Sequence, residues 1–266
     1  MNKHRILPVF DLYGTDFIVD VNKQVLREAE RPANEISFIS DMSEHQNLYL
    51  LRYDQVTKRP EAERTDQYIE VTEVPSLIEL DPEGMSLKYS IPVEQLKGKT
   101  DFEVMVDQEL LADRRRGILP QIDINGEAFV IDLKLQELRH AKYFFPVISL
   151  KSFDLTDDGW HYTAFYDTML KQPLTLDPKL LEMPDHVIQV KLPNEIGLDP
   201  VFTAQKYGMD ERELLRRHPI QKELKAEVIP LSETDVPRLI RQNKDELRQQ
   251  HEANRQRSKP RQRPRF

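Results

Sequence analysis

Four aspartates in strand-like segments are the first residues whose type and spacing suggest chemistry. Asp11 and Asp20 return later in the chain as Asp123 and Asp132. Paired carboxylates act as general acid and base in glycoside hydrolysis at separations of about 5 to 9.5 Å. A hairpin turning at Asn125-Gly126 places the second pair about four residues apart along the ladder, or roughly 13 Å. This spacing argues against a catalytic dyad and favours a solvated sheet face or a turn-capping role.

A closer acidic pair arises in the equivalent hairpin at Tyr13-Gly14, whose register sets Asp16 opposite Asp11. Like charges that face each other destabilise a strand pair, and a bound cation would relieve the repulsion. A metal-dependent hydrolase with an acidic site near Asp11 and Asp16 is therefore one hypothesis, and two solvated side chains that splay apart are the alternative. The later copy carries Ala128 in place of Asp16, so such a site exists only once.

The C-terminal segment is the strongest candidate for binding. From Arg238 onward the chain carries ten Lys/Arg and three Asp/Glu, a net charge of +7. The whole chain has a net charge of −8, so the residues before Arg238 carry −15. Six cations alternate with Gln, Ser and Pro, a composition typical of a disordered arm suited to phosphates. They are Arg255, Arg257, Lys259, Arg261, Arg263 and Arg265. Three interpretations are open: the tail binds nucleic acid or another polyanion, it docks on an acidic protein surface, or it has neither role.

The segment 199–217 has the spacing of a weak helix-turn-helix. Ala204 is followed four residues later by Gly208 at the turn and six residues after that by Leu214 in the second helix. Glu211 and Glu213 on that second helix would repel phosphates. A DNA-binding element and a structural helical corner are the two interpretations, and the charges favour the corner.

Aromatic residues gather in the second half of the chain, including the run Tyr143, Phe144 and Phe145. Phe144 and Phe145 occupy the place of Pro32-Ala33 in the first half, where nothing large is required. An exposed aromatic loop would indicate a protein contact. The alternative is packing between the two halves.

Several classes of site have no sequence signal. There is no Cys, the seven His show no HxH or HExxH spacing, and the eight Gly form no phosphate-binding loop. We therefore expect no cofactor, no metal of the Cys-rich kind and no catalytic residue. No apolar run approaches the roughly 20 residues of a membrane span, so the sequence predicts a cytosolic protein without a membrane partner.

The elements that position these residues occur twice. Residues 6–41 and 118–153 share many residue types at a constant offset of 112, among them Ile-Leu-Pro, Asp, Gly, Phe, Gln and Leu-Arg. Strands are predicted at 6–12, 15–21, 24–28, 35–39 and 47–53, with equivalents at 118–124, 127–133, 136–140, 146–151 and 160–166. Their short local connections predict one meandering antiparallel sheet in each half.

Helices follow each sheet. Asp81-Pro82 and Asp199-Pro200 each combine an N-cap with proline at the first helical position. A further helix begins at Asp101 and closes at Arg114 to Gly117, and a last one begins at Asp235. Its apolar periodicity ends near Glu252, and the basic segment from Arg255 to Arg265 is predicted to be a disordered tail.

The sequence thus predicts an α+β protein built by tandem duplication of a meandering antiparallel sheet followed by short helices, with a basic disordered C-terminal tail. The expected parts are a first repeat at 1–116, a second at 117–235, and a C-terminal helix and tail at 236–266. The leading functional hypothesis is a non-enzymatic binding or scaffolding protein. It would contact nucleic acid or another polyanion through the tail and a protein through the second repeat.

Overall fold

A two-residue turn begins each half of the fold. Tyr13-Gly14 joins β1 (Val9–Leu12) to β2 (Thr15–Asp20), and Asn125-Gly126 joins β9 (Gln121–Ile124) to β10 (Glu127–Asp132). All four turn residues have positive φ, as a type I′ turn requires. The predicted register is confirmed, since Asp11 lies opposite Asp16 and Asp123 lies opposite Ala128.

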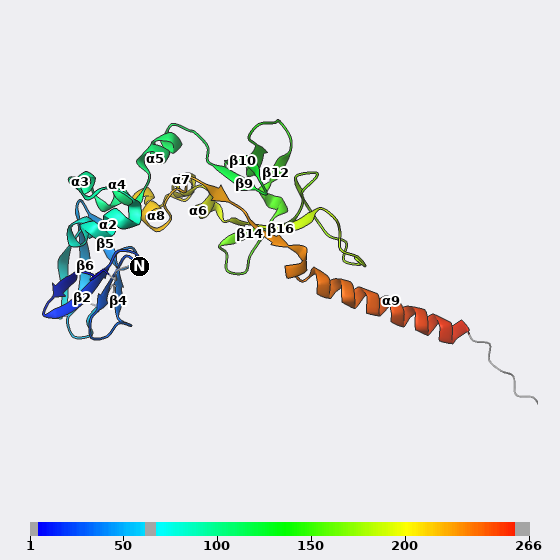
Figure 1. Ribbon diagram of the computed structural model, residues 1–266, viewed down its shortest axis with the longest axis horizontal. Coiled ribbons are helices and arrows are strands. Elements are labelled where there is room, and N and C mark those ends of the chain that lie inside the picture. Colours follow the sequence, from blue (N-terminus) through cyan, green and yellow to red (C-terminus); the bar gives the residue numbers. More distant parts are fainter. Residues whose placement is uncertain (1–4, 62–67, 259–266) are drawn as a thin grey trace, which may run out of the picture. The chain divides into compact units, whose positions relative to one another are not determined.

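A computed structural model describes residues 5–61 and 68–258 of the chain, with side chains as far as Asn254 (Figure 1). It is a mixed α+β protein with several antiparallel sheets. The chain divides into two compact units. Unit 1 combines Met1–Ala112 with Ala204–Ile220, and unit 2 combines Asp113–Thr203 with Gln221–Phe266.

Unit 1 contains two four-stranded sheets rather than the single meander that the sequence predicted. One has the order β1-β2-β3-β4, and in the other β6 lies between β5 and β8 and also pairs with β7. The remaining strands are β3 (Val25–Glu28), β4 (Glu35–Ser37), β5 (Met42–His45), β6 (Leu48–Asp54), β7 (Arg59–Pro60) and β8 (Ile69–Pro75).

Unit 2 has the same two sheets, each enlarged by one strand. The orders are β12-β11-β10-β9-β17 and β13-β14-β16-β18, with β15 also paired to β14. The remaining strands are β11 (Glu137–His140), β12 (Val147–Ser149), β13 (Asp154–Leu155), β14 (His161–Asp167), β15 (Gln172–Leu174), β16 (Val187–Pro193), β17 (Leu224–Lys225) and β18 (Glu227–Pro230).

The single-sheet prediction was wrong because the proline-containing segments were interpreted as connectors. β7, β8, β15 and β16 each contain proline, but at a strand end or on an edge, where the missing N–H is tolerated. Apolar side chains from both sheets of unit 2 meet in one core, which includes Phe129, Ile131, Tyr166 and Val190.

Short helices follow the sheets. They are α1 (Leu77–Leu80), α2 (Pro82–Tyr89), α3 (Val93–Leu96), α4 (Asp101–Met105), α5 (Gln108–Arg115), α6 (Glu195–Leu198), α7 (Pro200–Tyr207) and α8 (Glu211–Arg217), with 3₁₀ turns at Leu150–Ser152 and Leu231–Glu233. The predicted helix starts at Asp81-Pro82 and Asp199-Pro200 are confirmed. The helix predicted from Asp101 is broken into α4 and α5, because Val106 adopts an extended conformation.

Each aspartate that precedes one of the proline-started helices is buried and paired with an arginine. Asp81 accepts hydrogen bonds from Arg5 and from the backbone N–H of Gly84. Asp199 accepts them from Arg114, whose Nε lies at 3.2 Å, and from the backbone of Phe202. A bidentate guanidinium satisfies a carboxylate that would otherwise be buried without a countercharge.

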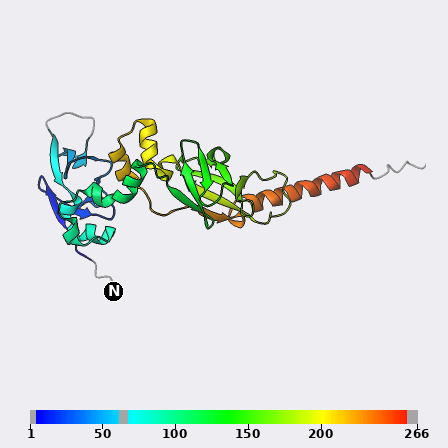
Figure 2. The ribbon, with the colours of Figure 1, turned by 90° about the horizontal axis from the view of Figure 1, so that it is seen from above.

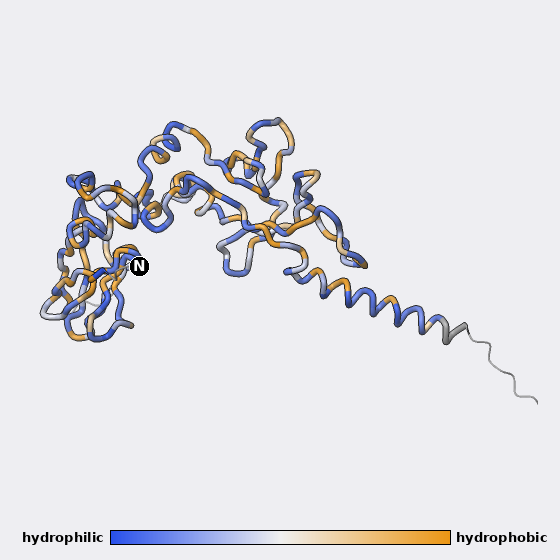
Figure 3. The backbone as a smooth tube through the Cα atoms, in the orientation of Figure 1, coloured by the Kyte–Doolittle hydropathy of each residue, from blue (hydrophilic) through white to orange (hydrophobic). Residues whose placement is uncertain are grey.

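The last helix, α9 (Val236–Ser258), is longer than the sequence predicted. Val236 and Ile240 are buried with Leu231 in a second cluster of unit 2, and residues 244–254 are all exposed. Hydrophilic residues dominate this part of the helix (Figure 3), and the whole helix is the one coloured orange to red in Figure 2. The helix includes residues 255–258 of the segment that was predicted to be disordered, because Arg and Gln support helix and the first proline after Pro237 is Pro260.

The unit boundaries differ from the predicted division at 116/117 and 235/236. Residues 204–220 were assigned to the second repeat but belong to unit 1, where Leu214, Leu215 and Arg216 are buried. The start of α9 was assigned to a separate tail but belongs to unit 2 through its buried residues.

Candidate functional site

The loop between β11 and β12 in unit 2 exposes three consecutive aromatic side chains. Tyr143, Phe144 and Phe145 are 65%, 94% and 79% exposed. None of the three is buried in the core of unit 2. Large solvent-facing apolar groups that lie together mark interaction surfaces. Their role in a protein contact stays a prediction.

His140 at the end of β11 anchors this loop. Its Nδ1 accepts hydrogen bonds from the backbone N–H groups of Lys142, at 3.1 Å, and Tyr143, at 3.3 Å. Nδ1 therefore carries no proton, and Nε2 donates to Oε2 of Glu127 at 3.0 Å. The His140 side chain is only 1% exposed, and its ring packs on Phe129 and Tyr143. A buried side chain thus fixes the first residues of an otherwise exposed loop.

Glu127 completes the anchor. Lys171 donates a hydrogen bond to its Oε1, and this bond, followed by the one from His140, holds the pKa of Glu127 below its ordinary value. Beneath them, burial raises the pKa of Tyr166 far above that of a free phenol. Glu127 is therefore ionised at neutral pH, and Tyr166 is neutral.

Unit 1 carries the same loop framework with different contents. Ala29 N–H donates to the carbonyl of Asp16, as Ala141 N–H does to that of Ala128. In place of His140, unit 1 has the buried Glu28, which accepts hydrogen bonds from Arg31 and Asn34. The bond from Arg31 is the main cause that lowers the pKa of Glu28. The polar loop of unit 1 and the aromatic loop of unit 2 thus share the backbone hydrogen bonds at their base.

Unit 2 also contains an open groove of about 750 Å³ beside the start of α9. Phe165, Leu174, Leu176 and Leu239 form its apolar lining. Charged groups at its rim include Lys151, Asp154, Asp235 and Arg238. Such a lining suits an apolar segment or side chain rather than a small polar substrate.

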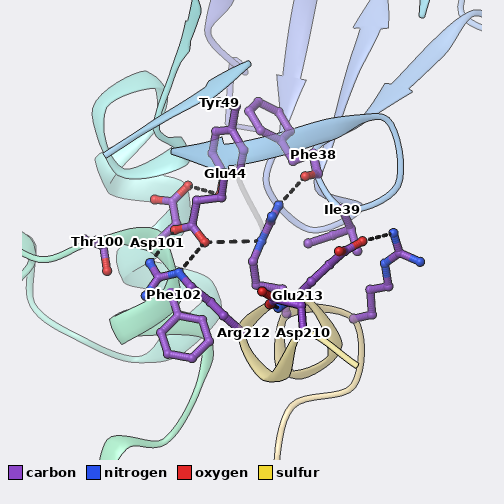
Figure 4. A network of polar contacts seen from close by, with 12 residues as sticks. Phe38, Ile39, Glu44, Tyr49, Thr100, Asp101, Phe102, Asp210, Arg212 and Glu213 are labelled. Carbon is purple, nitrogen blue, oxygen red and sulfur yellow. Dashed lines mark hydrogen bonds and ion pairs between the residues drawn. The ribbon is translucent and has the colours of Figure 1, made fainter. Parts of the chain in front are cut away.

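A buried polar network holds α8 in unit 1 (Figure 4). Arg212 donates to both carboxylate oxygens of Glu44, at 3.0 and 2.8 Å, and its guanidinium lies 4.2 Å from the ring centre of Phe102. Arg216 donates to the carbonyl of Phe38, and its Nε lies 3.7 Å from Glu44 Oε2. The guanidinium of Arg216 also lies over the ring of Tyr49.

This network bears on the helix-turn-helix hypothesis for 199–217. The predicted corner exists, since Gly208 has a φ of +64° and Asp210 caps α8 through the N–H of Glu213. However, Arg212 and Arg216 are engaged with Glu44, and Glu213 is exposed beside them. Two of the three cations of α8 bind Glu44 of the same unit, and the third, Arg217, pairs with the exposed Glu213, so the helix is poorly suited to phosphates.

The four strand aspartates cap turns, which confirms the structural alternative for them. In each case the side-chain oxygen accepts a backbone N–H three residues on, at 2.9 to 3.3 Å; the pairs are Asp11–Gly14, Asp20–Lys23, Asp123–Gly126 and Asp132–Leu135. Within residues 5–61 and 68–258, no group of three or more His, Asp or Glu side chains is arranged to hold a metal ion.

The predicted polyanion contacts fall at the limit of the described chain. Arg255 and Arg257 lie in the last turns of α9, and Lys259, Arg261, Arg263 and Arg265 lie outside the described residues. In that same described part of the chain, no helix is both long and apolar enough to cross a membrane.

Comparison of the chain with models of protein families, with curated proteins and with solved structures gives no match. The site is therefore argued from its own geometry. No role for the anchor His140 was predicted from the sequence. A signal was present, because His140 lies 112 residues after Glu28, the offset at which residue types recur, and both residues are buried polar groups.

Proposed function

We propose that the protein is a non-enzymatic, cytosolic binding protein that arose by tandem duplication and that contacts a protein partner through Tyr143, Phe144 and Phe145. The observation that carries the proposal is the exposure of three adjacent aromatic side chains on a loop that His140 fixes from beneath. Burying an exposed Phe side chain in an interface contributes about 1.5–3 kcal/mol to the free energy of binding. Anchoring the loop in advance lowers the ordering cost of binding.

Matching features of the two units support the duplication. The four-strand order β1-β2-β3-β4 corresponds to β9-β10-β11-β12, and positive φ recurs at Gln24 and Gln136 and at Lys58 and Lys171. The Arg5–Asp81 and Arg114–Asp199 pairs recur at the same helix starts. Duplication followed by divergence would explain why one frame carries a polar loop in unit 1 and an aromatic loop in unit 2.

Photo-crosslinking tests the loop directly. A benzophenone amino acid replaces Phe144 in the full chain, and a second version carries it at Leu87, which is 71% exposed on α2. In cells that produce the protein, position 144 should give a discrete adduct that position 87 lacks. Equal adducts from both positions, or none from position 144, would refute a specific contact at the loop.

The purified partner then gives the energetic test. Phe144→Ser should weaken its binding by at least about tenfold, as expected for an aromatic residue at the centre of an interface. Leu87→Ser removes a similarly exposed apolar group from unit 1 and should leave the affinity within about twofold. Because both side chains are exposed, neither change should alter folding.

A second candidate function is polyanion contact through the tail. It is favoured by the exposed, hydrophilic end of α9, which leads into the six cations from Arg255 to Arg265. The residues before Arg238 carry a net charge of −15, so any attraction to phosphates must come from this end of the chain.

A salt titration with short single- and double-stranded DNA and RNA tests this candidate. The comparison is between the full chain and a chain ending at Asn254, which keeps the buried Val236 and Ile240. A chain with all six cations changed to Gln is the control for length. If the tail binds duplex DNA, the log–log slope should be about −5, and both altered chains should lose it. Equal binding by all three would contradict the tail as the contact.

A further inference from the structure

The two units differ at the outer edges of their sheets. In unit 2, Leu224 and Lys225 of β17 pair in parallel with Ile122 and Asp123 of β9, and β18 pairs antiparallel with β16. One segment of seven residues, 224–230, therefore covers both edges. Among the residues that the structure describes, no strand covers the corresponding edges of β1 and β8 in unit 1.

The correspondence of these edges follows from the strand registers. β1 and β9 precede the same hairpin at an offset of 112, so Phe10 corresponds to Ile122 and Asp11 to Asp123. Val74 of β8 lies opposite Tyr49, and Leu192 of β16 lies opposite Tyr162, so Val74 corresponds to Leu192. The residues that precede them, Glu73 and Lys191, are therefore counterparts as well. The segment 224–230 thus shows the geometry of a strand that would fit unit 1.

Burial at the equivalent positions shows that unit 1 lacks this cover. Ile122 and Val190 are completely buried in unit 2, where Leu224 joins their core cluster. Their counterparts Phe10 and Thr72 are only half-buried. The backbone shows the same contrast: in unit 2 the carbonyl of Asp123 accepts a hydrogen bond from Ala226 N–H at 2.8 Å.

Val9 and Val71 lie on the uncovered edges of unit 1 and are 58% and 59% exposed. An exposed strand edge is a ready acceptor for an extended peptide, which adds main-chain hydrogen bonds and places alternate side chains on the core. The uncovered edges of unit 1 therefore have both the apolar surface and the free backbone that strand addition needs.

Charge indicates the kind of segment that fits. Lys225 lies opposite Asp123 in unit 2, and Asp11, its counterpart in unit 1, already faces Asp16. Lys191 of unit 2 pairs with Glu227 at 3.5 Å, whereas unit 1 has Glu73 at the place of Lys191. A strand across unit 1 would therefore meet acidic groups at both positions, so it must carry cations at both.

We propose that the edges of β1 and β8 in unit 1 form a binding site for an extended basic segment of a partner protein. The segment has an apolar residue at the position of Leu224 and cations at the positions of Lys225 and Glu227. A second copy of this chain is a poorer occupant, because its own Glu227 would face Glu73. The site rests on the strand registers and does not depend on the aromatic loop of unit 2.

The test uses a labelled peptide with the sequence of residues 221–231 and the change Glu227→Lys, titrated into the full chain by fluorescence anisotropy. It should bind more tightly than the unaltered peptide by about fivefold, as expected when an opposed charge pair replaces a like-charged pair across two strands. A version with Ala226→Pro lacks the central N–H and should lose binding. Failure of the Glu227→Lys peptide to bind overturns the proposal.

Reversing the charge at position 73 distinguishes binding at unit 1 from binding at unit 2. Glu73 is exposed, so Glu73→Lys should fold normally and reverse the preference of the two peptides. An unchanged preference would show that the peptide only replaces the strands of unit 2, and would overturn the proposal. If the unaltered peptide binds the original chain more tightly than the Glu227→Lys peptide does, the occupant is a second copy of this chain, and the proposal of a basic partner segment is overturned. Phe144→Ser should have no effect, which separates this test from that of the proposed function.

Discussion

Removing the charge of Glu44 should destabilise unit 1 far more than removing the charge of Arg212. Glu44 and Arg216 have side chains that are 5% and 3% exposed, whereas Arg212 is 47% exposed. Glu44→Gln leaves the Arg216 guanidinium buried with only the Phe38 carbonyl and the face of the Tyr49 ring. Breaking a buried ion pair from one side costs about 3–5 kcal/mol.

Arg212→Gln provides the matched comparison, because it loses a bond to the same carboxylate. An exposed ion pair contributes about 0.2–1 kcal/mol, and stacking on Phe102 adds about 0.5–1 kcal/mol. We therefore expect a cost of about 1–2 kcal/mol. In the double variant Glu44→Gln with Arg216→Met no buried charge remains, so it should be more stable than Glu44→Gln alone.

Hydrogen–deuterium exchange of peptides from β6 measures the stability of unit 1, and peptides from β14 report on unit 2 in the same sample. Glu44→Gln should speed exchange in β6 by about 100- to 1,000-fold or more and leave β14 unchanged. Equal effects of Glu44→Gln and Arg212→Gln, or a double variant less stable than Glu44→Gln, would refute the account of the buried network.

Three further predictions concern unit 2. His140→Leu removes the acceptor of two backbone bonds, so the amides of Lys142 and Tyr143 should exchange about tenfold faster by NMR; unchanged rates would contradict the anchor. Because the folded state lowers the pKa of Glu127, its stabilising contribution is present above the ordinary value of 4.5 and is lost as pH falls through the folded pKa. Melting temperatures should therefore fall less steeply below pH 4.5 in Glu127→Gln, and parallel curves would exclude this role. Leu224→Ala, at a residue that is 5% exposed, should cost about 2–5 kcal/mol in urea unfolding followed by Trp160 fluorescence; a cost below 1 kcal/mol would show that β17 is not part of the core.

Features set by neighbouring residues could be predicted from the sequence. The Asn125-Gly126 turn has one favoured geometry, and it fixed the register that sets Asp123 opposite Ala128. Asp followed by Pro marked the starts of α2 and α7 for an equally local reason. The start of α9 at Val236 followed from the same kind of signal.

Features that depend on distant partners could not be predicted. Glu44 and Arg212 are 168 residues apart, and nothing near either residue indicates that α8 belongs to unit 1. β8 and β16 became strands because each pairs along the full length of β6 or β14, which overrode their proline content. The aromatic loop was recognised from its composition, but its anchor was missed because the partners of His140 come from Glu127, 13 residues earlier, and from the loop backbone.

The most direct test of the central claim transfers the loop residues of unit 1 to unit 2. Phe144→Pro with Phe145→Ala reproduces Pro32-Ala33 on the shared backbone frame and keeps His140 and Tyr143. The measurement is the affinity of this variant for the purified partner that crosslinks at position 144. We predict a loss of about 100-fold, as expected when the central aromatic residues of an interface are removed, with an unchanged melting temperature. Binding within twofold of the original chain would contradict the claim that this loop is the protein-binding surface.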